Sequence, residues 1–179
     1  MKSRWEFILN LYFCFVVSFG YDNLSSFKKA TQSSRNNDTN ASPARAIDRD
    51  INTCSSTGPD NPAWWYVDLQ EIKSIHDIQI YFYGTDTAYK QRQRELTYGY
   101  QIYVSNTLDL SNLENLHHCY NHSGPDLPDL ISTHVCVSFG RYAMVYNERI
   151  PGVTYPFSNG VIQNFTYIQI CEITVNYKF

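Results

Sequence analysis

The 179-residue sequence lacks the charge excess, the long apolar segments and the catalytic motifs that mark several large classes of protein. Lysine and arginine number 14 against 17 aspartates and glutamates, and a net charge of −3 offers no attraction to a nucleic-acid backbone. After residue 20 no apolar run approaches the roughly 20 residues that a membrane-spanning helix needs. The sequence has no nucleophile elbow, His-Glu-x-x-His helix, phosphate-binding glycine loop or dinucleotide fingerprint, so we expect no enzyme.

The amino-terminal segment has the layout of a secretory signal peptide. Lys2 and Arg4 precede an almost wholly apolar run over residues 7–19, which is followed by Gly20. That run is too short to cross a bilayer as a helix. We therefore expect cleavage after Gly20, a secreted and extracellular product, and a single domain over residues 21–179.

Cysteine is scarce, and it becomes even in number once Cys14 is removed with the leader. In an oxidising compartment the remaining four should form two disulfides, although their spacing leaves three pairings open. These four are Cys54, Cys119, Cys136 and Cys171. Glycosylation sequons fit the same compartment, because only chains that enter the secretory route are modified there. They stand at Asn23, Asn37, Asn40, Asn121 and Asn164. Pro43 after the Asn40 triplet weakens that one, so we expect glycosylation at the other four.

The rest of the sequence reads as strands and turns. It is rich in Tyr, Ile, Val and Thr, and Gly, Pro, Asn and Asp interrupt it at short intervals. The predicted strands are residues 64–69, 75–83, 99–105, 132–138, 142–147 and 167–176. No apolar stripe of helical period runs beyond a turn or two, which favours one all-β sandwich or jelly roll. The long connections, among them residues 84–98, should gather at the sheet ends as functional loops.

The last predicted strand contains an irregularity. Ile168 and Ile170 fall on one parity, whereas Ile173 and Val175 fall on the other. One extra residue at 171–172, a β-bulge, would return all four side chains to one face.

An acidic turn near Cys54 is a candidate metal site. If Cys54 pairs with Cys171, Glu172 comes to lie beside the turn of residues 48–50, and three carboxylates meet. A calcium ion, which binds six to eight oxygens, would offset their repulsion. The candidate donors are Asp48, Asp50, Thr53 and Glu172. Alternatively, these aspartates only polarise a turn that Arg45 or Arg49 neutralises.

A histidine-rich segment suggests zinc at first sight. The residues concerned are His117, His118, Cys119 and His122. If Cys119 is oxidised in a disulfide, its sulfur cannot bind a metal, and we therefore do not expect zinc. Trp64 and Trp65 likewise suggest sugar stacking. However, Trp65, Val67 and Leu69 alternate along one strand face, and this pattern is more typical of a core.

Five blocks of sequence, in a fixed order, resemble the F-type lectin (fucolectin) family. They are residues 30–34, 44–48, 64–69, 140–142 and 171–175, and residues 146–156 are similar to modules that open multiple-EGF-domain receptors of molluscs. The resemblance implies a discoidin-like, antiparallel jelly-roll β-sandwich of about eight strands. It also implies disulfides joining Cys54 to Cys171 and Cys119 to Cys136. Its implied structural calcium is held by Asp48, Asp50, Thr53, Cys171 through its carbonyl, and Glu172.

The same resemblance places a sugar site whose usual residues are incomplete here. Fucose-binding members use one His and two Arg; the His position is Ser56, and the first Arg position is Tyr83. The polar loop that follows offers Tyr89, Arg92 and Arg94, an aromatic face with forked donors for hydroxyl or carboxylate groups. The alternative is a solvated basic loop without a ligand.

Two functions remain open. The first is a secreted, calcium-stabilised, lectin-like module that binds a glycan or glycoprotein, with an incomplete fucose triad. The second is an extracellular adhesion or scaffold domain that recognises a protein or a phospholipid surface through the partly apolar loop 150–157, with only peripheral membrane contact.

Overall fold

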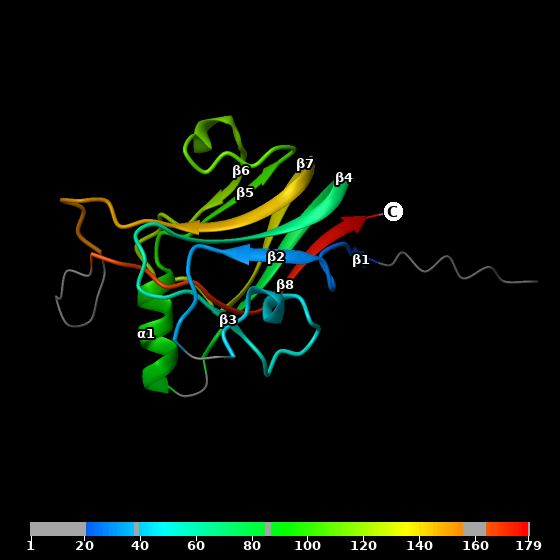
Figure 1. Ribbon diagram of the computed structural model, residues 1–179. Helices are drawn as coiled ribbons and strands as arrows, with labels where there is room; N and C mark the ends of the chain where they lie inside the picture. Colours follow the sequence, from blue (N-terminus) through cyan, green and yellow to red (C-terminus); the bar gives the residue numbers. More distant parts are fainter. Residues whose placement is uncertain (1–20, 38–39, 85–86, 156–163, 179) are drawn as a thin grey trace, which may run out of the picture.

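The structure is a computed structural model that describes residues 21–37, 40–84, 87–155 and 164–178 (Figure 1). The expected leader and the end of loop 150–157 lie outside these ranges. Eight strands, one α-helix and two short 3-10 helices occur in the described part of the chain. The strands are β1 (Tyr21–Asn23), β2 (Lys29–Gln32), β3 (Ser55–Ser56), β4 (Ala63–Phe82), β5 (Gln101–Ser105), β6 (His117–Asn121), β7 (Ile131–Asn147) and β8 (Gln169–Lys178). The helices are η1 (Pro43–Ala46), α1 (Thr87–Thr97) and η2 (Leu113–Asn115).

All named strand pairs are antiparallel, in the order β1-β8-β4-β7-β5-β6, with β2 on β4 and β3 on β8. The first half of β4 pairs with β2 and with the second half of β7, which β5 flanks. The second half of β4 pairs instead with β8 and with the first half of β7. The two long strands thus change partners along their length and carry the sheet from one layer of the sandwich to the other. The predicted all-β class is confirmed.

Strand β4 joins two strands that the sequence predicts separately, and β7 does the same. The polar segment near Gln70 reads as an interruption, but the strand bends there without ending. Gln70 has a φ of 76°, and the register between β4 and β7 shifts between Asp68 and Lys73. Arg141 donates from Nε and Nη2 to the two Asp68 oxygens, at 2.7 and 2.8 Å, which joins the strands at this bend.

The core lies between the two layers and follows the predicted alternation. Trp65, Val67 and Leu69 are fully buried, and the Trp65 indole donates to the Pro43 carbonyl at 3.0 Å. Burying each such side chain contributes about 1.5–3 kcal/mol. Trp64 points the other way and stacks on Tyr66. The structural prediction for this strand is therefore confirmed.

The predicted bulge in the last strand is present. Tyr81 pairs with Glu172, and the next residue, Phe82, pairs with Ile170, so Cys171 is the extra residue. The apolar residues on both sides of it are buried in one core. They are Ile168, Ile170, Ile173 and Val175.

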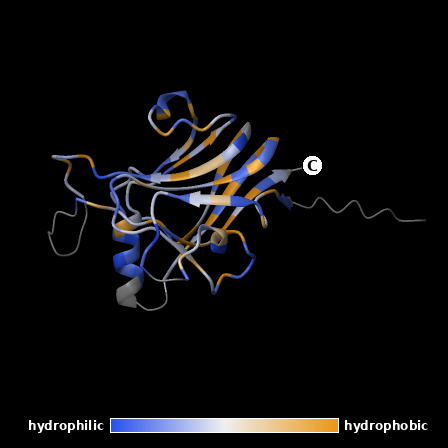
Figure 2. Ribbon diagram, viewed as in Figure 1, coloured by the Kyte–Doolittle hydropathy of each residue, from blue (hydrophilic) through white to orange (hydrophobic). Residues whose placement is uncertain are grey.

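The predicted loop over residues 84–98 is wrong, because most of it forms α1. Figure 1 shows this helix at one end of the sandwich, and Figure 2 shows that it is mostly hydrophilic. Its residues are good helix formers, such as Gln, Arg, Glu and Leu. The face turned inward is largely polar, since Gln93, Glu95 and Thr97 are buried beside Leu96. Amphipathic periodicity therefore could not indicate it. None of the helices in the described residues has the length and apolar composition that crossing a membrane requires.

The carboxyl-terminal turn of α1 is held by a buried arginine at the end of β7. Arg149 is 3% exposed and donates to the carbonyls of Glu95, Leu96 and Tyr98 at 2.7–3.0 Å. Such carbonyls have no partner within a helix. Gly99, with a φ of 80°, then turns the chain into β5. The helix is thus anchored by polar contacts and not by an apolar stripe.

Gly140 lies where β7 bends, and it provides a test of this packing. A Cβ at this position would collide with Val104 Cγ1 and lie 3.2 Å from the Ser105 backbone. We expect Gly140→Ala to lower the free energy of unfolding by about 1–3 kcal/mol, the usual cost of overpacking. Urea denaturation measures this. Gly124→Ala is the matched control, because nothing lies within 4 Å of that Cβ; equal stability of the two variants would contradict the packing described.

The role of Arg149 provides a second test. Arg149→Met would remove the guanidinium donor from three carbonyls, of which Leu96 keeps the Asn147 side chain and Glu95 keeps the Tyr98 amide as donors. We expect a loss of about 1–3 kcal/mol together with weakened α1 protection. Urea denaturation and hydrogen exchange of residues 90–98 measure the two effects. Lys90→Met, on an exposed position of the same helix, is the control. If the hydrogen-exchange rates of residues 90–98 are the same in the Arg149 variant as in the unmodified protein, Arg149 does not anchor α1.

Candidate functional site

The acidic turn and the late Cys-Glu pair meet, as the sequence predicts. A disulfide joins Cys54 to Cys171, with a Cα–Cα distance of 3.8 Å, and the Arg49 amide donates to Glu172 Oε2 at 3.0 Å. Arg49 has a φ of 66°, which turns its amide out of the regular backbone path. The pairing is the one that the resemblance implies.

Two of the predicted metal-binding side chains form one hydrogen-bonded turn. Asp48 accepts from the Asp50 amide at 3.0 Å and from the Thr53 hydroxyl at 2.5 Å. The Asp50 carboxylate instead accepts from the amide and side chain of Asn52. In the described ranges, the carboxylates of Asp48, Asp50 and Glu172 do not close on one point as a set of three. A cation here would therefore rely on backbone carbonyls as well as carboxylates.

The chemistry of Glu172 fits a nearby cation. The residue is 5% exposed, and its Oε1 has no hydrogen-bond partner. Burial, and to a smaller extent the Asp48 charge, raises the pKa of Glu172 to about 7 against the opposing hydrogen bond from Arg49. The guanidinium groups of the neighbouring arginines donate hydrogen bonds elsewhere, from Arg45 to Asn40 and from Arg49 to Ser26, and the Arg49 charge lowers the pKa of Glu172 only as the smallest of these effects. Hydrogen bonds from Asn52 and, as a smaller cause, the charge of Arg45 lower the pKa of Asp50, so the alternative of a turn partly neutralised by arginine stays open.

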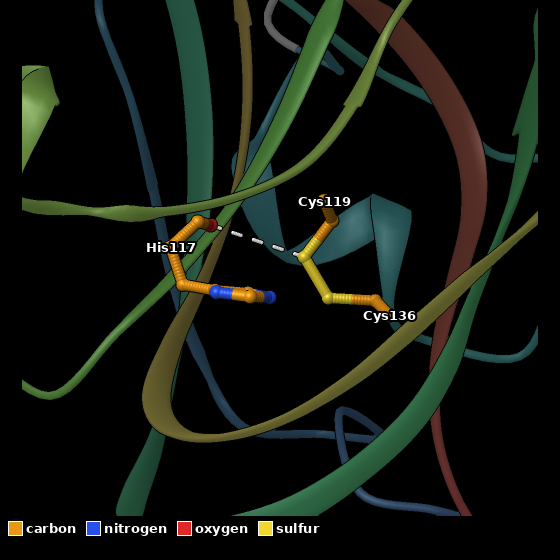
Figure 3. Close-up of side chains that lie close together, drawn as sticks. All are labelled: His117, Cys119 and Cys136. Atoms are coloured by element: carbon orange, nitrogen blue, oxygen red, sulfur yellow. Dashed lines mark hydrogen bonds between the residues drawn. A yellow bond between two sulfur atoms is a disulfide. The ribbon is translucent and has the colours of Figure 1, made fainter.

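The histidine-rich segment is occupied by the second disulfide. Cys119 is bonded to Cys136, and Cys119 Sγ lies 3.9 Å from the His117 carbonyl oxygen. Figure 3 shows the His117 ring beside the two bonded sulfurs. Although the three ligand atoms lie within 4.8 Å of one another, oxidised sulfur is not a zinc ligand.

Helix α1 separates two hollows that contain the predicted sugar-binding residues. The first, which we call the Ser56 pocket, has a volume of about 190 Å³. It is lined by Asn36, Ser56, Arg92, Gln93, Leu96, Tyr167 and Gln169. The second, the Tyr83 cleft, has a volume of about 880 Å³. It contains Tyr83, Lys90, Gln91, Arg94 and Asp129, and it borders the disulfide between Cys54 and Cys171.

The predicted ligand-binding residues therefore do not form one site. Ser56 and Arg92 share the Ser56 pocket, whereas Tyr83 and Arg94 line the cleft on the other side of the helix. Arg94 donates to the carbonyls of residues 127 and 128 at 2.7 and 2.8 Å, so part of its guanidinium fixes that loop. The side chain of Tyr89 lies outside the described part of the chain.

Sequence reasoning missed four polar residues of the Ser56 pocket. They are Asn36, Gln93, Tyr167 and Gln169. Gln93 is 3% exposed, and its Nε2 is a buried donor without a partner. The backbone of Ser56 is held by two hydrogen bonds to its carbonyl oxygen. Gln32 Nε2 donates one at 2.7 Å, and the backbone N–H of Asn36 donates the other at 3.1 Å. Without the helix, no sequence signal brings residue 93 next to residue 56.

A third hollow, of about 450 Å³, lies beside Tyr100, Tyr120, His122 and His134. Its polar groups pair with one another: Tyr100 Oη lies 2.7 Å from His134 Nε2, and Tyr120 Oη lies 3.0 Å from His122 Nδ1. Burial lowers the pKa of His134 to about 4, so this ring is neutral at pH 7. These residues act as a hydrogen-bonded support between β5, β6 and β7.

Of the four asparagines at which glycosylation is expected, Asn37, Asn121 and Asn164 are exposed. Asn23 is half-buried, and its side-chain oxygen accepts from the Ser25 amide and hydroxyl at 3.0 and 2.6 Å. The geometry is thus more open to modification at the first three.

Comparison with solved structures finds the same fold in sugar-binding proteins. A fucolectin from the serum of the striped bass, Morone saxatilis, is 24% identical with a TM-score of 0.68, over 88% of this chain and 49% of that chain. Chitosan-binding module 2 of a Paenibacillus sp. IK-5 chitosanase/glucanase, in complex with chitotriose, is 19% identical with a TM-score of 0.61, over 87% and 99%. The lectin domain of lectinolysin, complexed with Lewis B antigen, is 16% identical with a TM-score of 0.58, over 86% and 95%. The chain spans about half the length of the fucolectin chain.

No curated protein sequence matches the chain. A family model of the F5/8 type C group, described as a NedA-like, galactose-binding domain, matches residues 45–142. The match covers more than half of the 179 residues and extends from the acidic turn to the bend of β7. This agrees with the predicted kinship to discoidin-like galactose-binding domains, and the chain belongs to the NedA-like, galactose-binding domain family.

Proposed function

We propose that the chain is an extracellular carbohydrate-recognition module that binds one sugar unit of a glycan in the Ser56 pocket. The observation that carries the proposal is a small hollow in which several polar side chains have no partner among the described residues, although the Ser56 hydroxyl donates to the Thr57 carbonyl at 3.2 Å. Asn36, Arg92 and Gln169 make no side-chain hydrogen bond among the described residues, and the buried Gln93 Nε2 lacks an acceptor. A volume of about 190 Å³ equals that of roughly six water molecules, which suits a single sugar ring.

The chemistry of the lining supports a hydroxyl-rich ligand. Amide side chains both donate and accept, as sugar hydroxyls do. The buried Nε2 of Gln93 has lost its hydrogen bond to water without gaining another, which costs about 1–3 kcal/mol of stability. A ligand oxygen that accepts from this group would remove that cost on binding. Tyr167 and Leu96 add apolar surface for the ring carbons. The described lining residues include no carboxylate, the side chain that glycoside hydrolysis uses in pairs.

Structural relatives add support of a weaker kind. The lectinolysin domain is complexed with Lewis B antigen, and the chitosan-binding module is complexed with chitotriose. Both are under 25% identical to this chain, so neither identifies its sugar. The altered residues at positions 56 and 83 favour a ligand other than fucose.

We also propose that a calcium ion stabilises the acidic turn. The residues that would hold it are Asp48, Asp50, Thr53 and Glu172, together with Cys171 through its carbonyl. When bound, the ion supplies positive charge that offsets the buried carboxylate of Glu172. Its effect on sugar binding would be indirect, because Cys54 and Cys171 line the Tyr83 cleft and not the Ser56 pocket.

Secretion is consistent with these sites. Two disulfides are typical of proteins that fold in an oxidising compartment, and the leader and the exposed sequons agree with it. The glycan would then belong to a cell surface or a secreted glycoprotein.

An adhesion function is a second candidate, favoured by one observation. Ile150 and Val153 are 57% and 46% exposed at the edge of loop 150–157. Tyr155 instead packs its ring against Arg149, 4.5 Å away, and its hydroxyl accepts from the Ile150 amide. Two exposed apolar residues offer a smaller contact than the predicted loop would, so the glycan site remains the leading proposal.

Gln93→Leu tests the pocket. We expect it to weaken glycan binding about tenfold or more, since one ligand hydrogen bond is lost, and to raise the melting temperature of the free domain, since an unpaired buried donor is removed. Glycan-array screening followed by calorimetry measures the first effect, and thermal unfolding the second. Gln91→Leu, on the side of α1 facing the Tyr83 cleft, is the control. Full binding by the Gln93 variant would refute the assigned pocket.

Calcium removal tests the metal site. At a calcium concentration 100-fold above its Kd, linkage predicts about 2.7 kcal/mol of stabilisation, which corresponds to a fall of roughly 5–10 °C in Tm on chelation. Glu172→Gln should abolish that difference, whereas Glu71→Gln, on the exposed surface of β4, should retain it. The measurement is thermal unfolding with calcium or with chelator, and an identical Tm in both would rule out the site.

A further inference from the structure

We propose that the sugar bound in the Ser56 pocket carries a carboxylate and that Arg92 is its partner; the inference rests on the glycan-binding function proposed above. It deepens that function by naming the ligand class, an acidic sugar such as a uronic acid or a nonulosonic acid. The shared feature is a carboxylate on the ring.

Arg92 differs from the other arginines near the sites. Its side chain is exposed, lines the Ser56 pocket, and makes no hydrogen bond or ion pair in the described part of the chain. By contrast, Arg94 is bound to two loop carbonyls, Arg141 is paired with Asp68, and Arg149 anchors the helix. These three have structural partners in the fold, whereas Arg92 has none among the residues that the structure describes.

The charge of the pocket is positive and has no counter-charge among the described residues that line it. Among its lining residues Arg92 is charged, and the others are amides, hydroxyl-bearing side chains and one leucine. A carboxylate can accept two parallel N–H bonds from a guanidinium, an arrangement that is stronger than neutral hydrogen bonds. A neutral sugar would leave this charge without a counterpart.

Gln93 reinforces the preference from a fixed position. Its buried Nε2 needs an acceptor, and it follows Arg92 directly in a helix whose end is anchored by Arg149. Arg92 is exposed, whereas the Gln93 side chain is enclosed. Together they offer donors to an acceptor-rich group, while Asn36 and Gln169 remain available for hydroxyls.

The Tyr83 cleft provides an internal contrast. Lys90 and Arg94 line it, but so does Asp129, and Arg94 is already bound to carbonyls. Its cations therefore have anionic or polar neighbours within the protein. We therefore expect the Ser56 pocket, which Arg92 lines, to prefer an anionic ligand, and we expect no such preference in the Tyr83 cleft, which Lys90 lines.

The experiment uses the disulfide-bonded chain and compares matched ligands. Calorimetry would measure binding of oligosaccharides that end in a uronic acid or in a nonulosonic acid, each against its own methyl ester, which is neutral but otherwise the same. A sulfated sugar tests for a general anion effect. We expect each acid, or one of the two, to bind about tenfold or more tightly than its ester, with the difference shrinking at high salt.

Variants assign the effect to a residue. Arg92→Gln should reduce the ratio of acid to ester affinity to about one, and Arg92→Lys should retain part of it, because lysine keeps the charge but loses the fork. Lys90→Gln, in the same helix, should leave the ratio unchanged. Circular dichroism and Tm confirm that each variant is folded.

The outcomes separate the two proposals. Equal affinity for acid and ester, a preference that persists in Arg92→Gln, or an equal preference for the sulfated sugar would overturn the carboxylate inference and leave the glycan pocket standing. Absence of binding to every glycan on a broad array would overturn both.

Discussion

The arrangement of the whole domain depends on how β8 closes onto the rest of the chain. This strand pairs with β1, β3 and β4, and the disulfide from Cys171 to Cys54 joins it to the acidic turn. A bond across a sequence separation of 117 residues restricts the unfolded chain strongly, by about 4–5 kcal/mol on the entropic model. The bulge at Cys171 lets Ile170 and Ile173 enter the same core. One extra residue thus allows both the core and the disulfide to form.

The second constraint is polar. Helix α1 has no apolar stripe with which to dock, and it is held by Arg149 from the end of β7 and by Asn147, which donates to the Leu96 carbonyl at 3.1 Å. Because buried carbonyls without donors are costly, these contacts fix the position of the helix as firmly as apolar packing would. That position decides which residues face which hollow. Gln93 faces Ser56, and Arg94 faces Tyr83.

Local patterns in the sequence were sufficient for the long strands β4, β7 and β8 and for β5, but not for the site. They also missed the short strands β1, β2, β3 and β6, which lie in segments without a clear alternation of apolar residues. Alternation identified the buried face at Trp65, and the change of parity identified the bulge at Cys171. The disulfide pairing came from the family resemblance, since spacing left three choices. The helix was missed because its buried face is made of Gln93 and Thr97, and because its anchor, Arg149, lies far along the chain. The site residues then divided between two hollows that no local pattern distinguishes.

The hollows differ in whether their polar groups are already paired, and this difference carries the functional argument. Around Tyr100 and His134 each hydroxyl and ring nitrogen named above has a neighbour, and such networks specify a rigid fold. In the Ser56 pocket Gln93 keeps a buried donor without an acceptor, which lowers stability unless a ligand supplies one. Natural domains retain such penalties chiefly where function uses them. The unpaired donor and the unpaired cation lie on consecutive residues of one helix, so a single ligand can satisfy both.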